Sequence, residues 1–354
     1  MASTDSGRSA QLTWPEVLTA LVNRRNLTSS MAHWAMHEIL TGNATPAQIA
    51  GFAVALRAKG ETVEEISGLA DAMLGAATPI QLDRESVDVV GSGGDRANTV
   101  NVSTMAAIVA AGAGARVVKH GNRSASSLCG TADCLEALGL NLSVEPSRQA
   151  QILSDCSIVF LFAPLYHRAL RHTAGPRKEL GIQTTFNFLG PLANPARPRA
   201  QAIGVANHDL AGLVAGVLAR RGDRGVVFRG LDGLDELTTT GESEVWVVRD
   251  GEVHETTVNP AKIGIPRCQL EDLVGGDPVH NALVVRRLLD GQRGPVRDIV
   301  LLNAAATLVA FDGPAIDRSL DDQLIDALSR AEQAVDSGVA GATLERWVAA
   351  SNQA

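Results

Sequence analysis

From residue 87 onward the chain alternates short apolar runs with helix-like segments. Expected strands lie at 87–90, 116–119, 158–162, 202–205 and 225–228, and helices such as 105–113, 128–138 and 210–220 lie between them. A hairpin with an Asp250-Gly251 turn joins 244–248 to 253–257, and the chain is mostly helical from Val279. Strand–helix alternation is typical of a mainly parallel sheet flanked by helices, so we expect a larger α/β domain.

The first 80 residues follow a different pattern. Residues 1–11 have the composition of a flexible tail. Four short helices follow without a strand between them; Thr13, Thr28 or Ser29, Thr45 and Thr62 stand where they begin. We therefore expect a small helical domain at 12–80, and an α/β domain at 81–163 and 197–354. The proline-rich stretch 164–196 is interpreted as a segment that crosses to the helical domain and returns.

Composition excludes several classes of protein. Apolar residues make up 45% and charged residues 20%, which suits a globular chain with a sizeable core. The net charge of −8 gives no general attraction to nucleic acid or to an anionic membrane. The four cysteines match neither a zinc site nor a disulfide scaffold. Without an apolar leader or a run of ~20 apolar residues, we expect a cytoplasmic protein with reduced thiols and no membrane span.

A glycine-rich turn follows the first expected strand. Gly91-Ser92-Gly93-Gly94-Asp95 holds three glycines in four residues, so its backbone amides can approach a phosphate. It matches neither the Walker A motif nor the dinucleotide fingerprint, and a plain strand-to-helix turn remains the alternative. Asn101–Thr104 then opens a helix with side chains that either cap it or face the same anion.

A polar, cationic segment follows the second strand. Lys119-His120-Gly121-Asn122-Arg123 leads to Ser126-Ser127 and to Thr131. Carboxyl ends of parallel strands meet at one edge of a sheet, where ligands of open α/β sheets bind. Two cations, an amide and hydroxyls suit a phosphorylated sugar; a solvated loop is the alternative.

An acidic pair, Asp235-Glu236, follows the strand at 225–228. Adjacent carboxylates at a strand end suit Mg²⁺, a hard cation that bridges protein carboxylates and substrate phosphates. An acidic turn on a surface loop is the other interpretation. Together the glycine loop, the cationic segment and the acidic pair predict a site for a diphosphate with Mg²⁺.

In order and spacing these motifs resemble the anthranilate phosphoribosyltransferase family of tryptophan biosynthesis. The resemblance runs from about residue 13 to 350, and Phe162-Ala163-Pro164, Phe186-Asn187 and Asn194-Pro195 also fit it. It implies a nucleoside phosphorylase/phosphoribosyltransferase-like fold, usually as a homodimer. The activity implied is Mg²⁺-dependent transfer of phosphoribose from 5-phosphoribosyl 1-pyrophosphate to anthranilate. Arg96, Arg168, Pro176 and Arg229 depart from the family's usual residues.

The resemblance also implies roles for individual residues. The phosphoribosyl pyrophosphate would be held by Gly91, Gly94, Asp95, Thr99, Asn101, Val102, Ser103, Thr104, Lys119, His120, Gly121, Asn122, Arg123, Ser126, Ser127 and Thr131. Anthranilate would meet Gly91, His120, Asn122, Pro164, His167 and Arg177. Mg²⁺ would be bound by Ser103, Asp235 and Glu236. No residue is assigned as a general base, because a neutral aromatic amine needs positioning more than deprotonation.

Two other functions stay open at this point. A pyrimidine nucleoside phosphorylase would share the architecture but use phosphate without Mg²⁺, and Asp235-Glu236 and Arg177 argue against it. A non-catalytic relative that binds nucleic acid is disfavoured by the charge of −8 and by the intact diphosphate motifs.

Overall fold

The computed structural model describes residues 12–124 and 127–353. The chain divides into two compact units. One comprises the described residues up to Ala76 together with Ala169–Asn187, and the other comprises the described residues of 77–168 and 188–353. The returning segment is therefore shorter than the expected 164–196, because residues on either side of it, such as Tyr166 and Ala196, pack in the core of the α/β unit. The tail expected at 1–11 lies outside the described residues.

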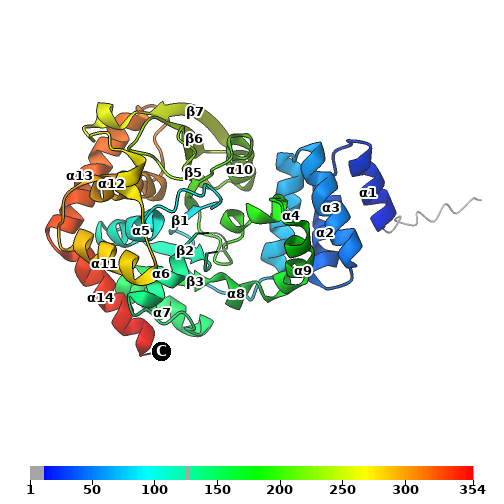
Figure 1. Ribbon diagram of the computed structural model, residues 1–354, viewed down its shortest axis with the longest axis horizontal. Coiled ribbons are helices and arrows are strands. Elements are labelled where there is room, and N and C mark those ends of the chain that lie inside the picture. Colours follow the sequence, from blue (N-terminus) through cyan, green and yellow to red (C-terminus); the bar gives the residue numbers. More distant parts are fainter. Residues whose placement is uncertain (1–11, 125–126, 354) are drawn as a thin grey trace, which may run out of the picture. The chain divides into compact units, whose positions relative to one another are not determined.

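The helical unit contains α1 (Trp14–Val22), α2 (Ser29–Leu40), α3 (Pro46–Lys59), α4 (Val63–Ala76), α9 (Arg171–Leu180) and the 3-10 turn η2 (Thr185–Asn187) (Figure 1). The first helices begin where the sequence placed their caps. Thr28 accepts a hydrogen bond from the Met31 amide, and Thr45 forms a capping box with Gln48. Between the helices, the Trp14 ring packs against the ring of Phe52 at 6.0 Å.

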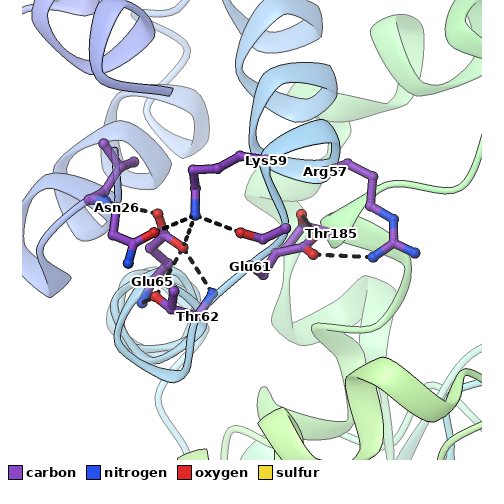
Figure 2. Close-up of polar contacts among 9 residues, drawn as sticks. Asn26, Arg57, Lys59, Glu61, Thr62, Glu65 and Thr185 are labelled. Carbon is purple, nitrogen blue, oxygen red and sulfur yellow. Dashed lines mark hydrogen bonds and ion pairs between the residues drawn. The ribbon is translucent and has the colours of Figure 1, made fainter. Parts of the chain in front are cut away.

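A buried polar network joins the helices of this unit (Figure 2). The Lys59 ammonium contacts the Glu65 carboxylate at 2.9 Å, and both side chains are buried. Glu61 accepts hydrogen bonds from Thr185 Oγ1 at 2.6 Å and from Arg57 Nη1 at 3.1 Å. Glu61 thereby ties the turn between α3 and α4 to η2, so the returning segment is fixed to the helices of its own unit.

The second unit is built on a seven-stranded sheet of order β3-β2-β1-β4-β5-β6-β7. Its strands are β1 (Val87–Gly91), β2 (Val117–Gly121), β3 (Ile158–Phe162), β4 (Ala200–Gly204), β5 (Arg224–Gly230), β6 (Ser243–Arg249) and β7 (Glu252–Val258). The first five strands are parallel and the last two are antiparallel, which confirms the mainly parallel sheet with its hairpin.

Helices cover the sheet and connect its strands. They are α5 (Val102–Gly112), α6 (Thr131–Ala137), α7 (Pro146–Cys156), α8 (Ala163–Tyr166), α10 (His208–Arg221), α11 (Pro278–Leu289), α12 (Pro295–Asp312), α13 (Leu320–Asp336) and α14 (Val339–Asn352). Single 3-10 turns form η1 (Arg168–Leu170), η3 (Gly190–Leu192), η4 (Pro260–Ile263) and η5 (Leu270–Leu273). Helices α5 and α12 pack together over the central strands, and α10 packs on β5, β6 and β7 (Figure 1).

Helices α6 and α7 differ from the sequence expectation, and α8 and α9 lie in or beside the stretch 164–196, for which no helix is predicted. Helix α6 begins at Thr131 and not at residue 128, because Leu128 is 67% exposed and Asp133 accepts the Gly130 amide to cap the helix there. Helix α7 was not expected, since its polar stretch carries only a few core residues such as Ile152 and Leu153. No helix in the described part of the chain combines the length and apolarity needed to cross a bilayer.

Candidate active site

The predicted phosphate and metal motifs gather at the carboxyl edge of the parallel sheet. The glycine loop follows β1, residues 122–124 and 127 follow β2, and Asp235-Glu236 follow β5. Strands β1, β4 and β5 are paired in register, which brings loops distant in sequence to the same edge.

The glycine loop uses backbone conformations that favour glycine. Gly93 and Gly94 have φ angles of 68° and 92°. A Cβ built on Gly93 would meet no atom within 4 Å, so this part of the loop borders open space. The Gly93 amide donates a hydrogen bond to Asp235 Oδ2 at 2.6 Å. Arg96, which stands where the family usually has glycine, also has a left-handed φ, 61°.

The acidic pair is buried, which corrects the expectation of a surface loop. Asp235 and Glu236 are 8% and 9% exposed. The burial depends on two glycines on neighbouring strands. A Cβ on Gly91 would lie 2.3 Å from Asp235 Oδ2, and one on Gly204 would lie 1.6 Å from the Asp235 carbonyl oxygen. Because neither position carries a side chain, the Asp235 turn packs directly against β1 and β4.

Burial and like charges act together on these carboxyls. Desolvation, followed by the charge of Asp95, raises the pKa of Asp235 to about 7. Desolvation and the charge of Asp235 raise the pKa of Glu236 well above its ordinary value. Three carboxylates from two loops therefore crowd together without enough nearby positive charge, and a divalent cation would relieve this repulsion.

Ser103, the third predicted metal ligand, lies beside the acidic pair. Its amide lies near enough to the Glu236 carboxylate to favour the charged form and lower the pKa of that carboxyl, and its hydroxyl accepts a hydrogen bond from Lys119 Nζ at 3.2 Å. Within 12–124 and 127–353 no three His, Cys, Asp or Glu side chains are grouped so that they could hold a metal ion by themselves. The donors present suit Mg²⁺, which keeps water and substrate oxygens among its ligands.

Lys119 lies on β2, and its side chain is buried. Its ammonium donates hydrogen bonds to the Val89 carbonyl and to Ser103. Desolvation lowers the pKa of Lys119 to about 8, partly opposed by the charges of Asp88, Glu236 and Asp235. The structure thus places this cation next to Ser103 and near the acidic pair.

Residues 99–104 are held mainly by contacts within the protein. Thr99 pairs with Val274 in an isolated bridge, and Asn101 Oδ1 accepts a hydrogen bond from Asn281 Nδ2 at 2.8 Å. Val102 is buried, and the hydroxyls of Thr104 and Thr131 lie 3.4 Å apart. These contacts fix the first turn of α5 and connect it to the start of α6.

The segment after β2 is more exposed. Asn122 Oδ1 accepts the Arg123 amide, and the Ser127 hydroxyl contacts that of Ser124 at 2.6 Å. The Arg123 guanidinium is paired with Asp133 and Glu136 at 2.8 Å, so its charge is already compensated. Gly121 ends β2. Ser126 lies outside the described residues.

Two of the predicted acceptor residues meet in the α/β unit. The rings of His120 and His167 lie 5.2 Å apart in an edge-to-face arrangement. His167 Nε2 contacts the Ala193 carbonyl at 2.7 Å, whereas His120 Nε2 is buried without a partner among the described residues. Desolvation lowers the pKa of His120 to about 3, so this imidazole is neutral at pH 7. Pro164 lies in α8, one turn before His167.

Arg177 belongs to the helical unit, where it lies in the last turn of α9 behind Pro176. It is half-buried, and desolvation lowers its pKa. Its guanidinium forms no ion pair with any residue that the structure describes.

Sequence reasoning missed two buried residues beneath the site, Asp88 and Asn194. Asp88 lies in an apolar strand, and Asn194 Nδ2 donates a hydrogen bond to its carboxylate at 2.9 Å. The signal was visible as an acid inside the run Val87-Asp88-Val89-Val90, an unusual position for a charge.

Known proteins resemble both units. A sequence profile of the glycosyl transferase family, a/b domain, matches residues 83–341, and the profile of the family's helical bundle domain matches 15–77. The anthranilate phosphoribosyltransferase of Arthrobacter sp. (strain FB24) is 58% identical over 349 residues, covering 99% of both chains. The chain belongs to the anthranilate phosphoribosyltransferase family.

Solved structures of this family agree with the fold. The anthranilate phosphoribosyltransferase of Thermus thermophilus is 40% identical, with a TM-score of 0.88 over 95% of this chain and 99% of that one. The enzyme of Saccharomyces cerevisiae, in complex with PRPP and Mg, is 28% identical with a TM-score of 0.86, covering 96% of this chain and 98% of the yeast chain.

Proposed function

We propose that the protein transfers the phosphoribosyl group of 5-phosphoribosyl 1-pyrophosphate to the amine of anthranilate, giving N-(5-phosphoribosyl)anthranilate and pyrophosphate in tryptophan biosynthesis. The observation that carries this proposal is the hydrogen bond from the Gly93 amide to Asp235. It joins the loop suited to phosphates to the carboxylates suited to Mg²⁺, as a diphosphate donor with a bound cation requires.

The reaction is a substitution at the anomeric carbon. The amine nitrogen of anthranilate forms the new bond, the bond between the anomeric carbon and the pyrophosphate oxygen breaks, and pyrophosphate leaves with the electron pair. The amine proton goes to solvent or to a phosphate oxygen. The glycine-loop amides, Lys119 and the first turn of α5 would hold the donor phosphates in place.

Ser103, Asp235 and Glu236 would hold Mg²⁺. When bound, the cation supplies positive charge that stabilises the departing diphosphate. The crowded, buried carboxylates support this assignment, and the yeast relative was solved with PRPP and Mg.

Anthranilate would be recognised by Asn122, His120, His167, Pro164 and Arg177. Arg177 suits the acceptor carboxylate because guanidinium binds carboxylates in a two-pronged geometry. Its half-buried guanidinium without an ion pair supports this role. The neutral imidazoles of His120 and His167 would present an uncharged surface to the aromatic ring.

The direct test follows the fluorescence of anthranilate. It should fall only when phosphoribosyl pyrophosphate and Mg²⁺ are both added, with one pyrophosphate released per anthranilate consumed. Cleavage of a pyrimidine nucleoside by phosphate without Mg²⁺ would instead support the phosphorylase interpretation.

We also propose a cytoplasmic homodimer formed through the helical unit. The exposed apolar side chains of Val22 and Val54 on that unit support an interface there. Light scattering coupled to size exclusion tests the dimer, and Val22→Asp should shift it toward monomer.

A further inference from the structure

The main-chain pairing between β1 and β2 is confined to the first residues of the two strands. Strand β1 pairs with β4 along its whole length, and β2 pairs with β3 along its whole length. Between β1 and β2 the register has one pair, Val87 opposite Val117. Beyond it the strands remain neighbours in the sheet, so their facing amides and carbonyls need other partners.

Three buried side chains supply these partners. The Asp88 carboxylate accepts a hydrogen bond from the His120 amide at 3.1 Å. Asn194 Nδ2 donates to the Val118 carbonyl at 2.8 Å. The Lys119 ammonium donates to the Val89 carbonyl. Polar side chains therefore take the place of the ladder hydrogen bonds that a regular parallel pair would form here.

Asp88 and Asn194 act as one connected pair. Asn194 Nδ2 also donates to Asp88 Oδ2 at 2.9 Å, and Asn194 Oδ1 accepts the Ala196 amide at 3.0 Å. Asp88 is fully buried and Asn194 is 3% exposed. The pair joins β1, β2 and the chain that returns from the helical unit, three segments that meet beneath the carboxyl edge.

The arrangement costs stability that a regular ladder would not. Desolvation raises the pKa of Asp88 to about 6 although Lys119, Asn194 and two amides favour its charged form. Apolar side chains between fully paired strands would carry no such cost. The benefit that we infer concerns the position of Lys119 and His120, which lie at the end of β2 where the ladder hydrogen bonds to β1 are missing.

We propose that Asp88 and Asn194 are positioning residues that set the end of β2, and with it Lys119 and His120, for transfer. This inference rests on the proposed function, which places Lys119 at the donor and His120 at the acceptor. Both side chains are buried, and we assign neither a contact with substrate. The pair acts through its hydrogen bonds to the His120 amide and the Val118 carbonyl, and through the negative charge of Asp88 near the Lys119 ammonium.

Exchanging the two side chains tests the proposal. Asp88→Asn sets an amide N–H against the N–H of either Asn194 or His120, because Asp88 accepts from both. Asn194→Asp sets two carboxylates against each other. The double exchange, Asp88→Asn with Asn194→Asp, restores a donor facing an acceptor and retains one negative charge near Lys119. It loses the hydrogen bond to the Val118 carbonyl, which then faces a carboxylate oxygen, so the recovery should be partial.

Each single variant should lower kcat by about 10- to 100-fold, with the KM of each substrate changed less than about threefold, since small displacements of aligned groups act mainly on the reaction step. The double exchange should recover at least tenfold in kcat over the weaker single variant. Hydrogen exchange of the peptide 117–122 should quicken in the single variants and slow again in the double exchange. Asn194→Ser, which keeps one donor, provides a milder variant if a single exchange does not fold.

Asp223→Asn is the matched control. Asp223 is also a buried aspartate whose pKa burial raises to about 6, but it precedes β5 at the opposite edge of the same sheet. The kcat of the Asp223→Asn variant should stay within twofold of the wild-type value. Folded single variants with wild-type kcat, or a double exchange as slow as the product of the two single losses, would overturn the proposal. Failure of the wild-type protein to consume anthranilate would instead contradict the proposed function.

Discussion

The amide of Gly93 and the carboxylate of Asp235 are joined by a 2.6 Å hydrogen bond across 142 residues of sequence. This bond fixes the loop after β1 to the turn after β5. A donor phosphate that approaches the glycine loop would meet the carboxylates that would bind Mg²⁺. A substitution in one motif should therefore alter the position of the other.

Replacing the acidic pair should impair the use of metal and leave the fold intact. Asp235→Asn with Glu236→Gln keeps the volume of both buried side chains and removes the repulsion with Asp95. We expect a higher Mg²⁺ requirement, slower turnover and a Tm that does not fall. Titration of activity with Mg²⁺ measures the first two effects. If the double variant kept wild-type activity at low Mg²⁺, neither residue would be a metal ligand.

Gly93→Val should weaken donor binding. The φ angle of 68° is strained for any side chain, at a cost of about 1–2 kcal/mol, and the branched group would fill the open space beside the loop. Calorimetry with phosphoribosyl pyrophosphate and Mg²⁺ should show a large loss of affinity.

Gly222→Val is the control for this substitution. Gly222 has a φ angle of 69° and open space around it, but it ends α10 before the amino end of β5. It should lose similar stability and bind the donor normally. If the two variants bind the phosphoribosyl donor with equal affinity, the glycine loop is a plain strand-to-helix turn and not a phosphate-binding loop.

Arg177→Ala should raise the KM for anthranilate by roughly 10- to 150-fold, because a hydrogen bond to a charged group is worth about 1.5–3 kcal/mol. The KM for the phosphoribosyl donor should stay nearly unchanged. Steady-state kinetics with each substrate varied in turn separates these effects. Lys178→Ala, an exposed cation in the same turn of α9, is the control and should change neither constant. An equal loss for both substrates would count against carboxylate recognition.

Lys59→Met should destabilise the helical unit by about 3–5 kcal/mol, because it leaves the Glu65 carboxylate buried without its cation. Denaturant unfolding measures this loss. Lys59→Met with Glu65→Gln should recover much of it, since no uncompensated charge remains. If the double variant is as unstable as the single one, the loss comes from packing of the lysine stem and not from the ion pair (Figure 2).

Asp223 should make stability depend on pH. Its pKa is raised from 3.8 to about 6 by burial, against the opposing charges of Arg221, Arg84 and Arg199. The folded state holds this proton more tightly than the unfolded state, so the contribution is complete below pH 3.8 and is lost as the pH rises through about 6. Relative to Asp223→Asn, the wild-type free energy of unfolding should fall over this range by at most about 3 kcal/mol. Parallel pH profiles of the two proteins would contradict this.

Local sequence was enough to predict the alternation of strands and helices and the start of each N-terminal helix. Apolar runs, capping residues and glycine turns act over a few residues, and their effect does not depend on what packs against them. The placement of the three motifs at one edge also followed, because successive parallel strands end at the same side of a sheet. The start of α6 and the presence of α7 did not follow, since Leu128 lies in an exposed turn and α7 has a largely polar sequence.

The sequence by itself determined which residues could bind a diphosphate and a cation, but only the tertiary structure decided their state. Asp235 and Glu236 are buried because Gly91 and Gly204, on two other strands, leave room for their turn. Asp88 keeps its place in an apolar strand because Asn194, 106 residues away, meets its carboxylate. Desolvation and hydrogen bonding depend on every group that surrounds a side chain, and those groups come from distant parts of the chain.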